Sequence, residues 1–241
     1  MIAITRPHGR SGETVKQVEE MGQEALIVPA VSIIPVLREE IAEKIGELSG
    51  YDWLVLTSVS GAEIMHKYFA DELKETKIAV IGPKTAEFLE EKGIKVELIP
   101  KEYRAESLAA EMAKTDIDGK KVLVARAAIG REVLITELKR HAEVVEVPIY
   151  KTIMPCDKTP MKDFLAALEE GKITAAIFTS SQNVKNMFAV LDRERLRDGL
   201  KGVKVCAIGP ITAETLQEYG VEVNIVPGEY TVEACLQEIK G

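Results

Sequence analysis

Two stretches of this sequence place a Gly-Pro pair and a threonine where an expected strand gives way to an expected helix. Residues 77–87 read KIAVIGPKTAE and residues 204–214 read KVCAIGPITAE. In each, a short apolar run typical of a buried strand precedes a glycine that permits close approach or a positive φ, and then a proline suited to the first helical turn. A helix beginning there presents unpaired N–H groups and a partial positive charge, which attract carboxylate or phosphate. Thr85 and Thr212 lie in that first turn, so the pattern predicts two anion-binding loops.

Other polar side chains follow the expected strands in the same way, and ligands of open parallel sheets bind at the carboxyl ends of the strands. The residues expected there have hydroxyls, backbone amides and arginine side chains but no cysteine, histidine pair or clustered carboxylates. Metal-dependent hydrolysis, Ser-His-Asp catalysis and paired-acid glycosidase chemistry therefore lack their parts, and an anion with many acceptors fits better. The hydroxyls at 57–58 and 179–180 would also simply cap the helices that follow. The candidate binding residues at these strand ends are Arg6, Thr57, Ser58, Thr85, Arg126, Ser180, Ser181 and Thr212.

The elements that would position these residues alternate as strand and helix, which is typical of a parallel α/β fold. About half the positions match between the two copies over roughly thirty residues at a constant offset, so we infer an internal duplication. We therefore expect two similar parallel-sheet domains of α/β type; that they are flavodoxin-like and joined by a two-stranded extended linker with a cleft between them is implied by the family resemblance described below. The expected strands include 2–5, 25–28, 53–58, 78–81, 96–99, 122–125, 144–147 and 175–180, and the expected helices include 13–21, 39–48, 61–69, 85–92, 105–114 and 131–141.

Two proline-marked extended segments, 30–36 and 148–155, occupy equivalent places in the two repeats. They are poor in Gly and Ser and rich in β-branched residues, unlike a flexible linker. Two such crossings suggest a chain that leaves its first domain early and returns late. We expect a discontinuous domain of 1–33 plus 153–241 and an inserted domain of 36–147. The repeat alone would favour two contiguous domains split near Asp118, and the family resemblance described below decides for the discontinuous arrangement.

Composition limits the classes of protein to which this chain could belong. With 241 residues, of which 46% are hydrophobic, the chain can bury two modest cores. A formal net charge of −8 gives no basic face for a nucleic-acid partner. No apolar run approaches the ~20 residues of a membrane span, and the first residues do not resemble a signal peptide, so we expect a cytoplasmic protein without membrane contact. The three cysteines, Cys156, Cys206 and Cys235, lack metal-ligand spacing.

The whole chain resembles the uroporphyrinogen-III synthase family, in the right order over essentially its full length. The closing stretch 207–213, AIGPITA, is the most specific match. The other matching places are Thr5-Arg6-Pro7, Phe178-Thr179-Ser180, and Gly130-Arg131-Glu132-Val133-Leu134 ahead of residues 147–152, VPIYKT.

This resemblance implies a cyclising lyase that closes the linear tetrapyrrole hydroxymethylbilane with loss of water and inversion of ring D. The product is uroporphyrinogen III, a precursor of haem, sirohaem and cobalamin. The resemblance also implies no metal and no organic cofactor, and it gives special weight to the linker tyrosine, Tyr150. The loop 126–131 lacks additional glycines often found in the family, although Arg131 keeps its place. Family positions implicated in substrate contact fall on Thr57, Ser58, Thr85, Ser180, Lys204 and Thr212, and Arg6, Arg126 and Arg131 could add bidentate contacts to carboxylates.

Without the family resemblance, the residues alone leave other interpretations open. Tyr150 lies between Pro148 and Pro155, where it could act as a general acid or only pack the linker. Two duplicated α/β domains around a cleft also describe ligand-binding proteins of the periplasmic-binding type, and a phosphate-binding transferase is a third alternative that lacks both common glycine-rich motifs. We expect a monomer whose partners are the bilane and, transiently, the enzyme that produces it.

Overall fold

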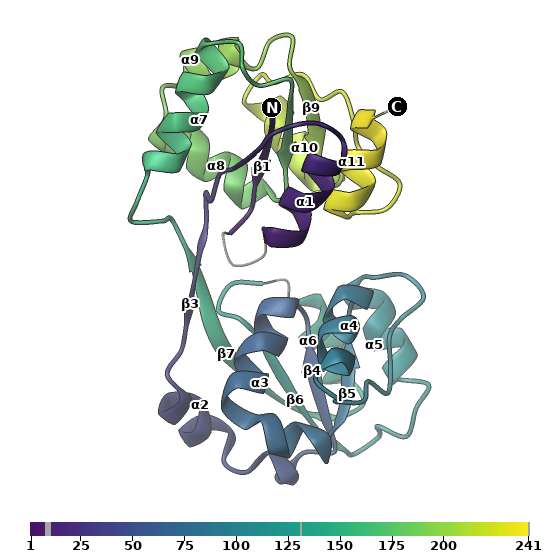
Figure 1. Ribbon diagram of the computed structural model, residues 1–241. Coiled ribbons are helices and arrows are strands. Elements are labelled where there is room, and N and C mark those ends of the chain that lie inside the picture. Colours follow the sequence, from purple (N-terminus) through teal and green to yellow (C-terminus); the bar gives the residue numbers. More distant parts are fainter. Residues whose placement is uncertain (8–10, 131, 241) are drawn as a thin grey trace. The chain divides into compact units, whose positions relative to one another are not determined.

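The computed structural model describes residues 1–7, 11–130 and 132–240. The chain divides into two compact units, which we call unit 1, Met1–Ser32 with Ile153–Gly241, and unit 2, Ile33–Thr152. The divisions fall at β3 (Ser32–Pro35) and at the end of β7 (Glu143–Ile153). Each unit is a mixed α/β structure built on a sheet of largely parallel strands (Figure 1).

Unit 1 has a four-stranded parallel sheet in the order β2-β1-β8-β9. Both central strands are buried along their whole length because helices cover both faces, which explains their uninterrupted apolar sequences. Ile2 pairs with Ala175, so segments from the two ends of the chain meet in the middle of one sheet. The strands are β1 (Ile2–Thr5), β2 (Ala25–Ile27), β8 (Ala175–Phe178) and β9 (Lys204–Ala207).

The helices of unit 1 enclose two cores. One hydrophobic cluster joins one face of the sheet to α7 (Thr159–Glu169), α8 (Ser181–Val190), α9 (Arg193–Gly199) and α10 (Pro210–Glu218). The opposite face packs on α1 (Gly12–Glu20) and α11 (Val232–Lys240), as Figure 1 shows.

Unit 2 has a five-stranded sheet in the order β3-β7-β6-β4-β5. Its remaining strands are β4 (Trp53–Leu56), β5 (Lys77–Val80) and β6 (Lys121–Ala127). One face packs on α2 (Arg38–Ile45), the 3₁₀ turn η2 (Leu48–Gly50), α3 (Val59–Lys74) and α4 (Pro83–Glu91). The other face packs on α5 (Ala105–Met112) and α6 (Val133–Leu138).

The strand order β7-β6-β4-β5 of unit 2 repeats the order β2-β1-β8-β9 of unit 1. In both units the strand before the Gly-Pro loop also makes one isolated parallel bridge, Ala79 to Leu98 and Cys206 to Ile225. Each bridge follows a glycine with positive φ, Gly93 at 71° and Gly220 at 76°. Equivalent elements therefore occupy equivalent positions.

Three details differ from the sequence-based expectations. The predicted strand 96–99 is wrong, because the segment makes only the isolated Leu98 bridge to β5. The predicted helix 39–48 ends at Ile45, and η2 follows after Gly46. Segments 144–147 and 148–153 form the single strand β7.

Candidate active site

Tyr150 lies on β7 beside an irregularity in the β6–β7 ladder. Arg126 pairs with Pro148, but Ala127 pairs with Tyr150, so the register shifts by one residue. Because side chains alternate along a strand, such a shift turns the following side chain to the other face. Val147, Ile149 and Tyr150 accordingly all contribute to the core cluster on the α3 side. The bulge is thus what brings the Tyr150 ring, only 7% exposed, to the start of α3.

The Tyr150 hydroxyl lies 2.9 Å from Ser58 Oγ. Ser58 follows β4 in extended geometry and caps α3, since its Oγ accepts a hydrogen bond from Gly61 N at 3.1 Å. The prediction that Ser58 caps a helix is confirmed. A phenol, a serine hydroxyl and a helix N-terminus are therefore linked in one chain of hydrogen bonds.

Gly61 lies close to the neighbouring strands, at a distance where an added methyl group would make ordinary contacts. A Cβ at this position would lie 3.4 Å from Ser58 Oγ and 3.6 Å from both Ala125 O and Ile149 Cδ1. The first turn of α3 consequently packs closely against β6 and β7. Thr57, which precedes the cap, is half-buried.

Arg126 is buried at the end of β6 and already paired. Its guanidinium contacts Glu132 at 2.6 Å and Glu146 at 2.5 Å. Burial lowers the pKa of Arg126, but hydrogen bonds and charge from the two carboxylates outweigh this effect and raise the pKa overall. The Nε and Nη2 groups of Arg126 are therefore already bonded to carboxylates of the protein itself.

The loop after β6 passes close to this guanidinium. A Cβ on Gly130 would lie 2.6 Å from Arg126 Nη1, so the position tolerates only glycine without a shift of the arginine. Ile129 is 90% exposed on the same loop. Arg131, the predicted binding residue that follows, lies outside the described residues.

The Gly-Pro loop of unit 2 leads directly into α4, as predicted. Gly82 has φ −137°, an extended conformation open to any residue, so the suggested positive φ is wrong. The alternative reason, close approach of a group to the backbone, stays a prediction, and the space a Gly82 Cβ would enter is open. Thr85 is 4% exposed in the first turn of α4.

The carboxyl edge of the sheet in unit 1 has the same kind of helix starts but different contacts. Ser180 caps α8 by accepting from Asn183 N at 3.1 Å, which confirms its predicted capping role. The Asn183 amide nitrogen donates to Thr5 O at 2.8 Å and to Thr179 Oγ1 at 2.9 Å, tying the ends of β1 and β8 together. Asn183 Oδ1 is buried without a partner in the described part of the chain. Sequence reasoning missed Asn183, and its position three residues after the Ser180 cap was the available signal.

The remaining predicted residues of unit 1 are dispersed along its carboxyl edge, with one exception. Arg6 Nη1 donates to Thr14 Oγ1, Ser181 begins α8, and Thr212 is buried in the first turn of α10. Gly209 precedes α10 at φ −168°, again extended, and a Cβ added there would lie 3.5 Å from the Tyr230 ring that covers it.

Lys204 is the exception, because the structure places it at the opposite edge. It is the first residue of β9, and its Nζ donates to Ile239 O at 3.2 Å. The four residues of β9 span about 10 Å, and the Gly209 loop lies beyond their far end. Lys204 therefore lies at the amino edge, away from the hydroxyls of the carboxyl edge, and the substrate contact that the family resemblance implies for it stays a prediction.

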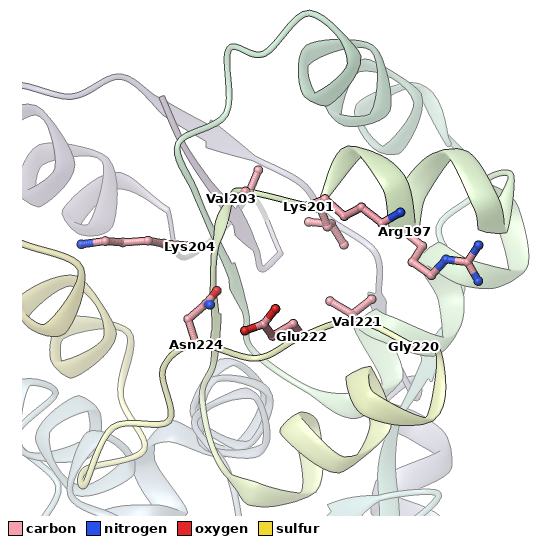
Figure 2. Close-up of a pocket in the computed structure, with 10 residues that line it drawn as sticks. Arg197, Lys201, Val203, Lys204, Gly220, Val221, Glu222 and Asn224 are labelled. Atoms are coloured by element: carbon pink, nitrogen blue, oxygen red, sulfur yellow. The ribbon is translucent and has the colours of Figure 1, made fainter.

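Lys204 instead borders a hollow of about 380 Å³ at the amino edge of unit 1, lined also by Arg197, Lys201 and Glu222. Figure 2 shows the Lys204 side chain extending away from Arg197 and Lys201, so the cations do not converge. Lys201 is moreover paired with Asp198 at 2.9 Å. This hollow does not form an anion site.

Two further features concern residues 1–7, 11–130 and 132–240, namely the grouping of metal-ligating side chains and the length and apolarity of the helices. No cluster of three His, Cys, Asp or Glu side chains in these ranges could hold a metal ion. None of the helices described there is both long and apolar enough to cross a membrane.

The fold and these edges define an α/β protein of two units whose strand ends carry hydroxyls and helix N-termini. The model of the family "Uroporphyrinogen-III synthase HemD" matches residues 12–237. The chain belongs to the uroporphyrinogen-III synthase family, which confirms the predicted resemblance and shows that it is an enzyme of tetrapyrrole biosynthesis. The binding-protein and transferase alternatives are thereby set aside.

Individual relatives agree over nearly the full length. A Synechococcus elongatus uroporphyrinogen-III synthase is 31% identical, with 99% of this chain and 94% of that protein covered. A Methanothermobacter thermautotrophicus protein, described provisionally as a uroporphyrinogen-III synthase, is 35% identical over 96% of this chain and 94% of its own. The crystal structure of the Helicobacter pylori uroporphyrinogen-III synthetase, 17% identical, covers 99% of this chain and 97% of that one with a TM-score of 0.65, which supports the fold.

Proposed function

We propose that this chain converts hydroxymethylbilane to uroporphyrinogen III and that Tyr150 is its general acid. The observation that carries the proposal is the Tyr150 hydroxyl, turned by the β7 bulge to within 2.9 Å of the serine that caps α3. This phenol stands at the carboxyl edge of the sheet, where open α/β proteins bind ligands.

The acetate and propionate groups of the bilane are bound mainly by backbone dipoles. A chain of formal charge −8 gains no long-range attraction to an anion, so local donors must supply the binding. The N-termini of α3 and α4 in unit 2 present such donors, and those of α8 and α10 in unit 1 present the same kind. The side chains proposed to add contacts are Arg6, Thr57, Thr85, Ser180, Ser181 and Thr212.

The chemistry requires one proton transfer and a shaped site. Tyr150 donates its proton to the hydroxyl oxygen of the hydroxymethyl group as the C–O bond breaks and water leaves, while the pyrrole nitrogen lone pair forms the azafulvenium cation. The substituted carbon of ring D then attacks, and the resulting spiro intermediate fragments and recloses in the other orientation. The proton lost when the last pyrrole becomes aromatic returns to the Tyr150 oxygen, so the net change is loss of one water.

We also propose that the two units are the products of the inferred duplication and that β3 and β7 connect them. The repeated strand order and the paired isolated bridges support this origin. The expected cleft, the monomeric state, the transient contact with the bilane-producing enzyme and the absence of a cofactor stay predictions.

The test is incubation with freshly made hydroxymethylbilane and separation of the type III isomer from the type I ring that forms spontaneously. Tyr150→Phe keeps the ring and removes the donor, so turnover should fall at least tenfold, a threshold set below the ~10²–10⁴-fold that acid assistance typically contributes. Tyr51→Phe is the matched control, because Tyr51 is a buried tyrosine of the same unit whose hydroxyl bonds Ile45 O at 3.1 Å. It should lose stability and keep its turnover.

Near-full turnover in Tyr150→Phe would remove the tyrosine from the mechanism and leave the reactivity of the bilane and the geometry of the site as the catalyst. Absence of type III product with the unmodified protein would overturn the function itself.

A further inference from the structure

The Ser58 hydroxyl contains one hydrogen and two acceptor lone pairs, and the structure accounts for most of them. Gly61 N–H occupies one lone pair at 3.1 Å, and the Tyr150 hydroxyl is the other neighbour at 2.9 Å. Among the described residues, Ser58 has no second acceptor for its hydrogen, and the Tyr150 side chain has no second hydrogen-bond partner. The direction of this one bond therefore decides where the Tyr150 hydrogen points.

We propose that Ser58 donates to the Tyr150 oxygen and is a positioning residue for the acid, rather than a contact to the substrate. With this direction, the Ser58 hydrogen is satisfied and the Tyr150 hydrogen is left for the substrate hydroxyl. The inference rests on the proposed function, because it assigns the partner of the proposed acid.

The same bond stabilises the oxygen after its proton has left. Transfer of the Tyr150 proton to the departing hydroxyl forms water and leaves a phenolate, which needs a donor. Ser58 supplies that donor, and Gly61 N–H strengthens it because a hydroxyl that accepts one hydrogen bond donates a stronger one. The positive end of the α3 dipole lies beside this oxygen and favours the negative charge. The Ser58 proton itself stays on Ser58 throughout.

The equivalent cap in unit 1 shows that a tyrosine is not needed to build such a helix start. Ser180 accepts from Asn183 N at the same distance of 3.1 Å, and within the described ranges its hydroxyl has no tyrosine partner. The Ser58–Tyr150 bond is thus an addition to the cap, made where the β7 bulge turns Tyr150 inward.

The experiment is a double-mutant cycle on the full chain with hydroxymethylbilane as substrate. Ser58→Ala should lower kcat about tenfold with KM within twofold, because the lost bond acts on the acid and not on binding. Ser58→Thr keeps the hydroxyl and should retain more than half of kcat. In the Tyr150→Phe background, Ser58→Ala should lower kcat by less than twofold, since the oxygen it serves is already gone.

Thr231→Ala controls for the cost of losing a cap. Thr231 Oγ1 accepts from Ala234 N at 3.1 Å ahead of α11 in unit 1, whereas Ser58 and Tyr150 belong to unit 2. It should lower Tm about as much as Ser58→Ala does and leave kcat unchanged.

The possible results distinguish failure of the positioning role of Ser58 from failure of the proposed acid role of Tyr150. An unchanged kcat in Ser58→Ala, or the same tenfold loss in both backgrounds, overturns the positioning role even if Tyr150→Phe is impaired. A large rise in KM with normal kcat returns Ser58 to substrate binding. A fully active Tyr150→Phe overturns the proposed acid instead.

Discussion

The carboxyl edges of the two units share a strand order but differ at the residue three places after the capping serine. In unit 2 that residue is Gly61, which leaves α3 packed against β6 and β7 and the Ser58 hydroxyl in contact with Tyr150. In unit 1 it is Asn183, whose amide ties the ends of β1 and β8 together. The same scaffold position thus adjoins the Ser58–Tyr150 hydrogen bond in unit 2 and ties two strand ends together in unit 1.

The arginines at the carboxyl ends of the equivalent strands β1 and β6 also differ in how firmly they are held. Arg126 is buried between Glu132 and Glu146, whereas Arg6 is half-buried and bonds Thr14. The Gly-Pro loops show the opposite difference. In unit 2, Gly82 borders open space, whereas in unit 1 the Tyr230 ring covers Gly209. Unit 2 therefore combines a fixed arginine with an open helix start.

The largest expected effect of this difference is on the free energy of unfolding when each arginine is replaced. Arg126→Met leaves two glutamates facing each other without their cation and should lower the free energy of unfolding by about 2 kcal/mol. This is below the ~3–5 kcal/mol of a fully buried pair, because 70% of the Glu132 side chain and 33% of the Glu146 side chain are exposed. Arg6→Met should cost about 1 kcal/mol, the value of one hydrogen bond. Urea unfolding measures both.

A second substitution identifies the cause of that loss. Glu146→Gln in the Arg126→Met background should recover part of the stability, because it removes one of the two repelling charges. Equal costs for Arg126→Met and Arg6→Met would contradict the contrast between the two edges.

The next effect concerns the position three residues after each capping serine. Asn183→Ala removes the bonds to Thr5 and Thr179 and should destabilise by about 1–2 kcal/mol, since the unpartnered Oδ1 leaves with them. Gly61→Ala places its Cβ at ordinary contact distance, 3.4 Å from Ser58 Oγ, and gains helix propensity of up to about 1 kcal/mol. Thermal unfolding should show opposite signs for the two variants, and a destabilised Gly61→Ala would mean that the first turn of α3 has no room for a methyl group.

The smallest effect is expected at the Gly-Pro loops. Gly82→Ala is compatible with φ −137° and meets open space, so Tm should be unchanged. If a carboxylate approaches the α4 backbone there, the added methyl should raise KM about fivefold, a loss of roughly one hydrogen bond. Gly209→Ala, already covered by Tyr230, should raise KM less. Steady-state kinetics compare the two, and an unchanged KM in Gly82→Ala would exclude close approach at this loop.

Much of the fold could be predicted because its signals are local. Short apolar runs with β-branched residues located β1, β4, β6 and β8 to within a few residues, and Gly-Pro and Ser signals located the starts of α3, α4, α8 and α10. Segment 96–99 failed because a sheet edge gives such a run only one bridge. The mixed α/β class with parallel sheets was correct.

Less of the site could be predicted, because its decisive contacts join residues far apart in sequence. The Ser58–Tyr150 bond depends on a one-residue register shift between β6 and β7, which no residue pattern announces. The pairing of Arg126 with Glu146 depends on the same two strands. The substrate contact expected of Lys204 came only from the family resemblance, and with Lys204 at the start of β9 it stays a prediction.

The division of the chain also sets an order for its synthesis. Unit 2 is one uninterrupted run, so all its strands are synthesised before β8 of unit 1. Strand β1, with its buried Ile2 and Ile4, must therefore wait without its central neighbour while another sheet is completed. Unit 2 should fold first as the chain emerges, and the apolar N-terminal strand is the segment most in need of protection from aggregation until the C-terminal third arrives.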